Sequence, residues 1–335
     1  MSNIPCKDSY IRSVLVYPLS GYGNRLQAIA SAAILAEKLG AELSICWDAQ
    51  AVAPGKANEV FAQEFCNRYI LTSEQAEQRW GCSRANIPLY LNIDRKRRQV
   101  TLAGHYRGEQ AFMAELPRAL ADECMPETLV IAAGGQFFLP DPTESFSVGL
   151  TRFRCQRKDF YSQLRFTLEV ESAVREQLLS RPPYVGLHLR YTDRALQAPM
   201  EGSIRRALRN TTQEAGIEDV FIASDTLGTR ERWSAIAAKL GLRPWAVDHK
   251  EWNRSNVSAG HSALIDWLLL TSARSLVYFR ESTFALEACV AGGSFDRSTG
   301  LATSVLRGLL LRGRDYAQRA ITYPRRHGWG SSAPL

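Results

Sequence analysis

The sequence has no hydrophobic run long enough to span a membrane. Its most apolar later stretch, Leu264–Leu270, contains Asp266 and is far shorter than the roughly 20 residues that a transmembrane helix needs. The segment from Met1 to Tyr10 includes Lys7 and Asp8 and lacks the apolar core of a secretory signal. We therefore expect a cytoplasmic protein whose contact with membranes is at most peripheral.

Cysteine is scarce, and its spacing is not that of a metal site. The seven cysteines are scattered, include no C-x-x-C pair and have no histidines nearby at zinc spacing. An odd and dispersed set of this kind indicates reduced thiols rather than a disulfide framework. With 335 residues, of which 45% are hydrophobic, the chain is long enough to build two cores, in two domains of about 150 residues each.

Lysine is also rare: the chain has seven lysines and 34 arginines, with a net charge of +7. Because the arginine fork binds phosphate through two parallel hydrogen bonds, this bias favours phosphorylated ligands or an anionic lipid surface. The basic runs 94–98 and 325–327 lack the interleaved aromatic residues of a nucleic-acid-binding module. We interpret both runs as solvated faces and do not expect nucleic acid as a partner.

In the first half of the chain, β-rich runs alternate with helical periodicity, which is typical of α/β proteins. The pattern predicts strands at 14–18, 41–47 and 129–135, and a helix over 26–39 that ends at Gly40. Between residues 48 and 128 it predicts helical pieces near 57–69 and 109–122, separated by polar loops.

The second half repeats the alternation more regularly. The predicted strands are 184–189, 220–224, 244–247 and 276–279, and the predicted helices lie near 204–215, 229–240 and 263–272. Right-handed crossovers between such strands produce a parallel, doubly wound sheet. We place the domain boundary close to residue 170, between domains at 1–170 and 171–335, and expect a last helix at 301–320 that crosses back over the first domain.

The most informative stretch runs from Tyr184 to Arg194, where an apolar run typical of a buried strand precedes a set of polar residues. His188, Arg190, Asp193 and Arg194 lie near or beyond the carboxyl end of this strand. Open α/β sheets bind their ligands at such strand ends. An arginine fork with a neighbouring acid and imidazole suits an anionic nucleotide, and a surface ion pair is the structural alternative.

Two later segments present similar groups at strand ends. Asp225 follows the strand 220–224, where it can accept hydrogen bonds from a base or a ribose or can cap the next helix. Ser282 and Thr283 open a helix after the strand 276–279. A helix start of this kind can bind an anion, although serine and threonine are also ordinary capping residues.

A fourth segment, Gly21 to Leu26, connects the first strand to the first helix. Gly21 and Gly23 allow a backbone to approach a ligand closely, while Asn24 and Arg25 supply hydrogen-bond donors. The third glycine of a dinucleotide-binding fingerprint is missing from this loop.

Taken in order, these segments resemble the GDP-fucose-dependent fucosyltransferase superfamily, which has the α/β GT-B fold of two Rossmann-like domains facing across a cleft. The most similar groups are the α1,6-fucosyltransferases of the bacterial nodulation and core N-glycan types, and the protein O-fucosyltransferases. The resemblance makes 1–170 the acceptor-side domain and 171–335 the domain that binds the GDP-sugar. It extends from residue 12 to 292 and is carried by Gly21–Asn24, Tyr161–Phe166, His188–Arg194, Ala223–Asp225 and Asp266–Thr283.

The resemblance implies a role for most of these residues. Arg190 corresponds to the arginine that binds the β-phosphate of GDP, His188 and Asp225 to guanosine contacts, and Ser282 to a hydroxyl on the phosphate. Asn24 corresponds to an asparagine near the transferred sugar. The remaining residues expected in the nucleotide-sugar site are Gly23, Arg25, Asp193, Arg194 and Thr283.

The catalytic residues implied are Arg190, Asn24 and a general base. Core-fucosylating relatives have a glutamate a few residues after the arginine motif, where this chain has Ala198. Glu201 lies nearby and is the predicted base. Asp193 is a second candidate, which could equally serve to orient Arg190.

The implied activity belongs to carbohydrate biosynthesis: an inverting, metal-independent transfer of L-fucose from GDP-fucose to a hydroxyl of a glycan, a lipid-linked glycan, a peptide or a small molecule. None of the 13 aspartates is followed by a second one two positions later, so the metal-holding D-x-D motif of the other large transferase fold is absent, and we expect no metal or cofactor. Three alternatives stay open: a transferase for another nucleotide sugar, a non-catalytic sugar- or nucleotide-binding relative, and a nucleic-acid-binding protein.

Overall fold

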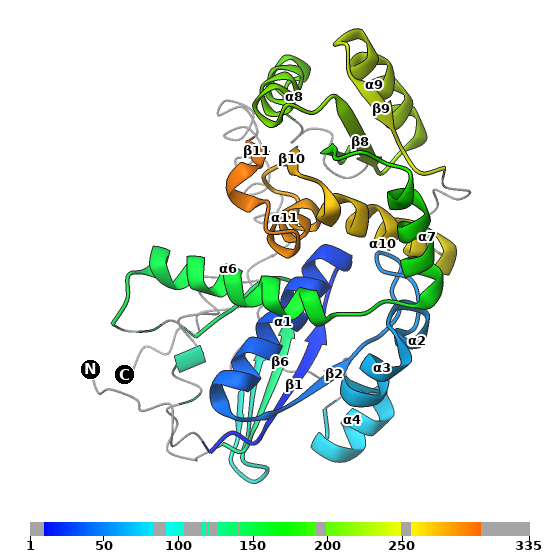
Figure 1. Ribbon diagram of the computed structural model, residues 1–335. Coiled ribbons are helices and arrows are strands. Elements are labelled where there is room, and N and C mark those ends of the chain that lie inside the picture. Colours follow the sequence, from blue (N-terminus) through cyan, green and yellow to red (C-terminus); the bar gives the residue numbers. More distant parts are fainter. Residues whose placement is uncertain are drawn as a thin grey trace, which may run out of the picture.

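The amino-terminal half of the chain forms a six-stranded sheet of β1 (Ser13–Pro18), β2 (Glu42–Cys46), β3 (Ile70–Leu71), β4 (Asn92–Asp94), β5 (Gln99–Ala103) and β6 (Thr128–Ala133) (Figure 1). The computed structural model describes residues 10–82, 92–103, 116–117, 120, 126–139, 141, 143–191, 199–248 and 256–302. The strand order is β3-β2-β1-β6-β5-β4, and all pairs are parallel except the hairpin of β4 and β5.

Helices cover both faces of this sheet. Helix α1 (Tyr22–Leu39) packs on one face, and α4 (Ser73–Trp80) packs on the other face through Ala76 and Trp80. Two short helices, α2 (Ala57–Val60) and α3 (Gln63–Tyr69), precede β3. Helix α1 ends at Gly40, whose φ of 64° lies in the left-handed region that favours glycine, so the predicted stop is confirmed.

Two helices lead from the first sheet to the second. Helix α6 (Phe146–Gln163) crosses α1, and α7 (Leu168–Leu179) runs up to the second sheet, as Figure 1 shows. Ser145 caps α6, since its hydroxyl accepts the Val148 N–H at 3.4 Å.

The second sheet consists of β7 (Val185–Leu189), β8 (Asp219–Ser224), β9 (Arg243–Trp245), β10 (Ser275–Phe279) and β11 (Thr299–Leu301). Its order is β11-β10-β7-β8-β9, and every pair is parallel. The intervening helices are α8 (Glu201–Ala215), α9 (Leu227–Lys239), α10 (Val257–Ser272) and α11 (Thr283–Ala291). The chain adds β8 and β9 on one side of β7 and then crosses to add β10 and β11 on the other side.

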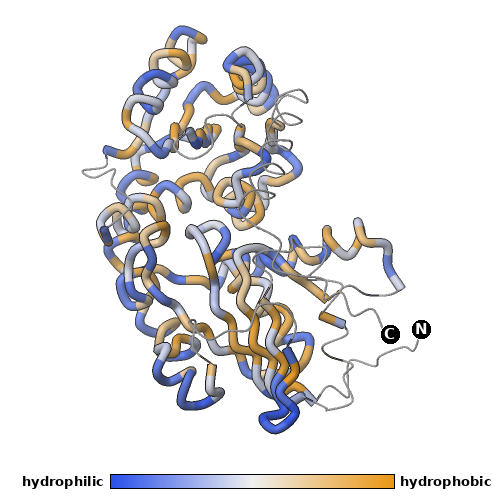
Figure 2. The backbone as a smooth tube through the Cα atoms, turned by 180° about the vertical axis from the view of Figure 1, so that it is seen from behind, coloured by the Kyte–Doolittle hydropathy of each residue, from blue (hydrophilic) through white to orange (hydrophobic). Residues whose placement is uncertain are grey.

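Alternating side chains of the second sheet enter two different cores. Val185, Leu187 and Leu189 pack under α8 and α9, whereas the opposite face lies under α10 and α11. That second core continues into the first half, because α10 and α11 also pack against α7, α6 and α1. Figure 2 shows the hydrophobic residues concentrated along the central strands of the sheets.

The sequence predicted most of these elements within a few residues. All seven predicted strands are present, as are the helices after β1, β7, β8 and β9. The region 48–128 differs, because it contains α4 and the hairpin of β4 and β5 where polar loops were predicted. The predicted helix at 301–320 is wrong at its start, since Leu301 ends β11, and residues 303–320 lie outside the described part of the chain, as do most of 109–122.

Candidate functional site

The carboxyl ends of β7 and β10 are neighbours at the point where the strand order of the second sheet reverses. His188 of β7 pairs with Tyr278 of β10 and with Ala223 of β8. From these ends, the helices α8 and α11 leave toward opposite faces of the sheet. A crevice at such a switch point is where open α/β sheets bind their ligands.

His188 faces the core under α11, on the opposite side of β7 from Leu187 and Leu189. Its side chain is buried, and its ring lies 5.3 Å from the ring of Phe284, between centroids, at an interplanar angle of 30°. This packing fixes the orientation of the imidazole beside the start of α11.

Asp225 joins the ends of β7 and β8. Its two carboxylate oxygens accept the backbone N–H of Tyr191 at 3.0 and 3.1 Å. Arg190 is half-buried and lies immediately before Tyr191, so this bond also fixes the backbone from which the Arg190 side chain extends. Arg190 and Asp225 therefore lie at the same edge of the sheet.

Ser282 caps α11. Its hydroxyl accepts the Ala285 N–H at 3.5 Å, its own N–H donates to Phe279 O at 2.8 Å, and its side chain is buried. The hydroxyl therefore has the ordinary capping role. Thr283 is half-buried at the first position of the helix, where N–H groups point away from the helix and suit an anion.

The glycine loop of the first half lies directly against this helix start. A Cβ atom added to Gly23 would lie 2.5 Å from the N and Cα atoms of Phe284 and 2.9 Å from Thr283 C. Glycine is required at this position because no side chain fits between the starts of α1 and α11. Asn24 is half-buried beside it, and its side-chain amide donates to Ser20 Oγ at 3.0 Å.

Arg25 lies at the start of α1, but its side chain points into the protein instead of toward a ligand. Its side chain is fully buried, with Nε donating to Ser20 O at 2.8 Å and Nη1 donating to Asp48 O at 2.6 Å. The guanidinium also stacks on Trp47 at 4.6 Å from the ring centroid. These contacts argue against the predicted ligand contact, because the Arg25 side chain is used to connect the loops that follow β1 and β2.

Glu201, the predicted base, is engaged elsewhere. Its carboxylate forms ion pairs with Arg205 and Arg232. Partial desolvation raises the pKa of Glu201, but the two arginines outweigh it and hold the pKa below its ordinary value. Both ion pairs argue against a role as general base. The other two predicted residues of this region, Asp193 and Arg194, lie outside the described residues.

Two residues close to the site were not predicted. Phe284 packs against both His188 and Gly23, and Glu287 lies one turn further along α11 in a buried hydrogen-bonded cluster. The sequence did contain a signal for Glu287, since a single acid in the apolar run Phe284–Ala291 requires a buried partner.

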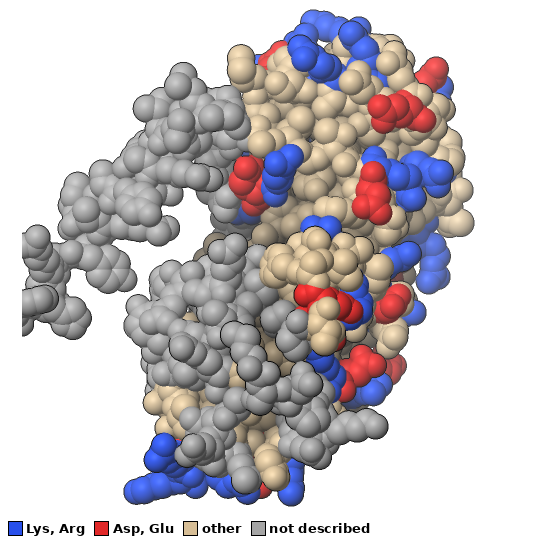
Figure 3. Space-filling view, turned by 90° about the vertical axis from the view of Figure 1, so that its left-hand side faces the viewer, with Lys and Arg blue, Asp and Glu red and all other residues tan. Residues whose placement is uncertain are grey.

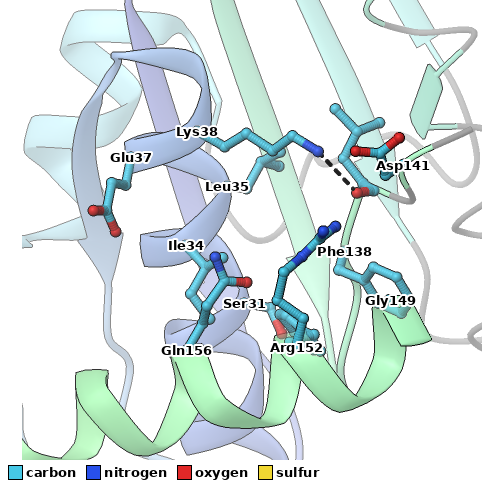
Figure 4. A pocket seen from close by; sticks show the side chains of 12 residues that line it. Ser31, Ile34, Leu35, Glu37, Lys38, Phe138, Asp141, Gly149, Arg152 and Gln156 are labelled. Atoms are coloured by element: carbon cyan, nitrogen blue, oxygen red, sulfur yellow. Dashed lines mark hydrogen bonds between the residues drawn. The ribbon is translucent and has the colours of Figure 1, made fainter. Parts of the chain in front are cut away.

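A separate pocket of about 360 Å³ lies between α1, α6 and the segment after β6. Ile34, Phe138 and Phe153 form its apolar part, and Lys38 and Arg152 reach toward Asp141 at its rim (Figure 4). Arg152 is paired with Glu144, and Lys38 donates to Leu139 O at 3.2 Å. Its lining residues belong to α1, α6 and the segment after β6, so this pocket does not include the strand ends of the second sheet.

The described surface mixes charges of both signs. Basic and acidic side chains are interspersed over the part of the face visible in Figure 3. Exposed pairs such as Arg243 with Glu218 and Asp219 contribute to this mixture. Among the described residues, no helix is long and apolar enough to cross a membrane, and no group of three or more histidine, cysteine or acidic side chains is arranged to hold a metal ion.

No family model and no curated protein matches the sequence. Several solved structures match the fold. Arabidopsis thaliana FUT1, as a mutant in complex with GDP, has a TM-score of 0.57 and 15% identity, covering 84% of this chain and 69% of that one. The α-1,6-fucosyltransferase NodZ soaked with GDP-fucose has a TM-score of 0.54 and 17% identity, covering 84% and 92%. A crystal structure of the fucosyltransferase NodZ from Bradyrhizobium also matches.

POFUT1 in complex with GDP has a TM-score of 0.50 and 10% identity, covering 88% of this chain and 98% of that one. At these identities the similarity shows the fold. The chain thus has the two-sheet GT-B fold of these fucosyltransferases, as the resemblance in its sequence predicts.

Proposed function

We propose that this chain is a glycosyltransferase that moves L-fucose from GDP-fucose to a hydroxyl group of an acceptor. The observation that carries the proposal is the meeting of His188, Asp225 and the start of α11 at the switch point of the second sheet, opposite Gly23. Its fold is shared with transferases that were solved with GDP or GDP-fucose bound.

In this proposal the donor lies across the ends of β7, β8 and β10. His188 and Asp225 bind the guanosine, because carboxylate oxygens accept the hydrogen bonds that a guanine ring edge or a ribose donates. The diphosphate lies between Arg190 and the N–H groups at the start of α11. Asn24 faces the sugar from the first half.

The reaction follows from this arrangement. The acceptor oxygen attacks the anomeric carbon while the bond from that carbon to the β-phosphate oxygen breaks, which inverts the configuration. The proton of the acceptor hydroxyl passes to a base, for which Asp193 is the remaining candidate from the sequence, and negative charge develops on the departing GDP. Arg190, with Arg194, stabilises this charge more strongly in the transition state than in the ground state. Because arginine supplies the positive charge, the proposed mechanism needs no metal.

The acceptor is a glycan or another hydroxyl-bearing molecule, which we expect to bind to the first half. A cytoplasmic location and peripheral membrane contact stay predictions from the sequence.

Two measurements test the proposal. Calorimetric titration with GDP, UDP and ADP compares the nucleotides, and the proposal requires a preference for GDP. Incubation with GDP-fucose and a panel of glycans and peptides, with and without EDTA, measures released GDP and the anomeric configuration of the product. Preference for UDP or ADP would indicate another donor, and GDP binding without any product would indicate a non-catalytic relative.

A further inference from the structure

A cluster of four buried polar side chains connects three helices from both halves of the chain. The Glu287 carboxylate of α11 accepts Arg157 Nη1 at 2.7 Å and Gln27 Nε2 at 2.9 Å on Oε1, and the Tyr161 hydroxyl at 2.6 Å on Oε2. Gln27 belongs to α1, and Arg157 and Tyr161 belong to α6. Arg157 and Glu287 are 1% and 0% exposed, so water does not compete for these bonds.

The donor set favours an ionised carboxylate. Burial raises the pKa of Glu287 above its ordinary value, and the Arg157 guanidinium and the Tyr161 and Gln27 hydrogen bonds offset part of this rise. The guanidinium and the amide nitrogen can only donate, so Oε1 carries no proton. The Arg157 cation 2.7 Å away favours the ionised carboxylate over a form with its proton on Oε2. We therefore assign Glu287 as the anion of a buried ion pair, with Tyr161 as a third donor.

The cluster lies directly behind the site. Gln27 follows Gly23 by four residues, about one turn of α1, and Glu287 follows Ser282 by five residues, about one and a half turns of α11. The starts of the same two helices touch at Gly23 and Phe284. Helices α1 and α11 are thus in contact at two successive points, at Gly23 with Phe284 and at Gln27 with Glu287. A small shift at the cluster therefore moves the starts of both helices.

Buried ion pairs are poor stabilisers, because the cost of removing both charges from water offsets most of their attraction. Their directional hydrogen bonds, however, fix the relative orientation of the elements that carry them. We infer that Glu287, Arg157, Tyr161 and Gln27 form a positioning cluster that sets the start of α11 against α1 and thereby sets the affinity for the diphosphate of the donor. The inference rests on the proposed function, since it concerns the same site.

A pair of matched tyrosine variants tests the inference. Tyr161→Phe removes one donor from Glu287, and Tyr184→Phe removes a buried hydroxyl that donates to Leu269 O of α10 at 2.7 Å and makes no hydrogen bond to the cluster. Both variants keep the packing of the ring. Calorimetry measures their affinities for GDP and for GMP, and the ratio of the two does not depend on the folded fraction.

We expect Tyr161→Phe to lower the affinity for GDP about fivefold to tenfold, because the loss of one hydrogen bond to a charged group changes an equilibrium by about this factor. The affinity for GMP, which lacks the β-phosphate, should change less than about twofold. Tyr184→Phe should leave the ratio unchanged. Arg157→Lys, which keeps the charge but loses the planar fork, should lower the ratio further.

If the wild type prefers GDP and the two variants have the same ratio of GDP affinity to GMP affinity, the positioning role of the cluster is wrong, and the proposed function is unaffected. A wild-type protein that binds neither nucleotide would overturn the proposed function and this inference with it.

Discussion

The facing edges of the two sheets differ in what they present. In the second half, the strand ends carry His188, Arg190 and Asp225, whose side chains can bind a ligand. In the first half, the end of β1 leads to Gly23, which has no side chain, and to Arg25, whose side chain is buried. In the proposed site, the second half supplies the binding groups and the first half supplies close backbone contact.

Two arginines illustrate the difference. Arg190 is half-buried at a strand end, whereas Arg25 is fully buried between two backbone carbonyls and a tryptophan ring. The same residue type therefore has a proposed role in transition-state stabilisation in one half and a structural role in the other.

The largest effect is expected for Arg190→Ala. Loss of one charge-assisted contact in the transition state costs about 3 kcal/mol, so kcat/KM for GDP-fucose should fall by about 10² or more without a matching loss of thermal stability. Arg206→Ala, at an exposed position of α8, is the control and should behave as wild type. Near-normal activity of the Arg190 variant would remove this residue from the proposed role.

Arg25→Met should show the opposite behaviour. The partly buried carbonyls of Ser20 and Asp48 lose their donors, which costs on the order of 2 kcal/mol of the free energy of unfolding. The folded fraction should keep kcat/KM within about tenfold of wild type, since only the loop position changes. Chemical denaturation measures the stability. A loss of activity equal to that of Arg190→Ala, at unchanged stability, would restore Arg25 to the donor site.

Gly23→Ala tests the backbone contact between the halves. Alanine favours a helix by up to about 1 kcal/mol over glycine, but its Cβ would lie 2.5 Å from backbone atoms of Phe284, and overpacking of this kind costs about 1–3 kcal/mol. We expect the affinity for GDP to fall about tenfold.

Gly21→Ala is the matched control for this variant. Gly21 has extended backbone, and the nearest atom to an added Cβ, Val52 O, is 3.5 Å away. Its affinity for GDP should stay within about threefold of wild type. If the two variants bind GDP alike, the contact between the helix starts does not shape the donor site.

The smallest effect is expected for Glu201→Gln. The two arginines already hold the pKa of Glu201 below its ordinary value, so the carboxylate stays ionised to a lower pH than an ordinary glutamate and is a weak base. We expect kcat to change less than about threefold and the acidic limb of the pH–rate profile to stay in place. A large loss of kcat together with loss of that limb would identify Glu201 as the base.

The sequence was sufficient to predict those structural features whose residue pattern lies within one segment of the chain. The strand 185–189, the stop at Gly40 and the acid after β8 follow from apolar runs and from glycine at a helix end. The hairpin of β4 and β5 escaped prediction because β4 has three residues, too few for a periodic pattern, and the polar turn between the strands dominates the composition.

The sequence by itself determined the α/β class, the two halves and the strand ends at which His188, Arg190 and Asp225 lie, because periodicity and the order of strands are local properties of the chain. The tertiary structure alone decided that Arg25 is buried, that Gly23 meets Phe284, and that Glu287 joins Gln27, Arg157 and Tyr161. The last two outcomes depend on helices more than 100 residues apart, whose relative position comes from packing across the shared core. The burial of Arg25 depends on the loops after β1 and β2 meeting around its side chain.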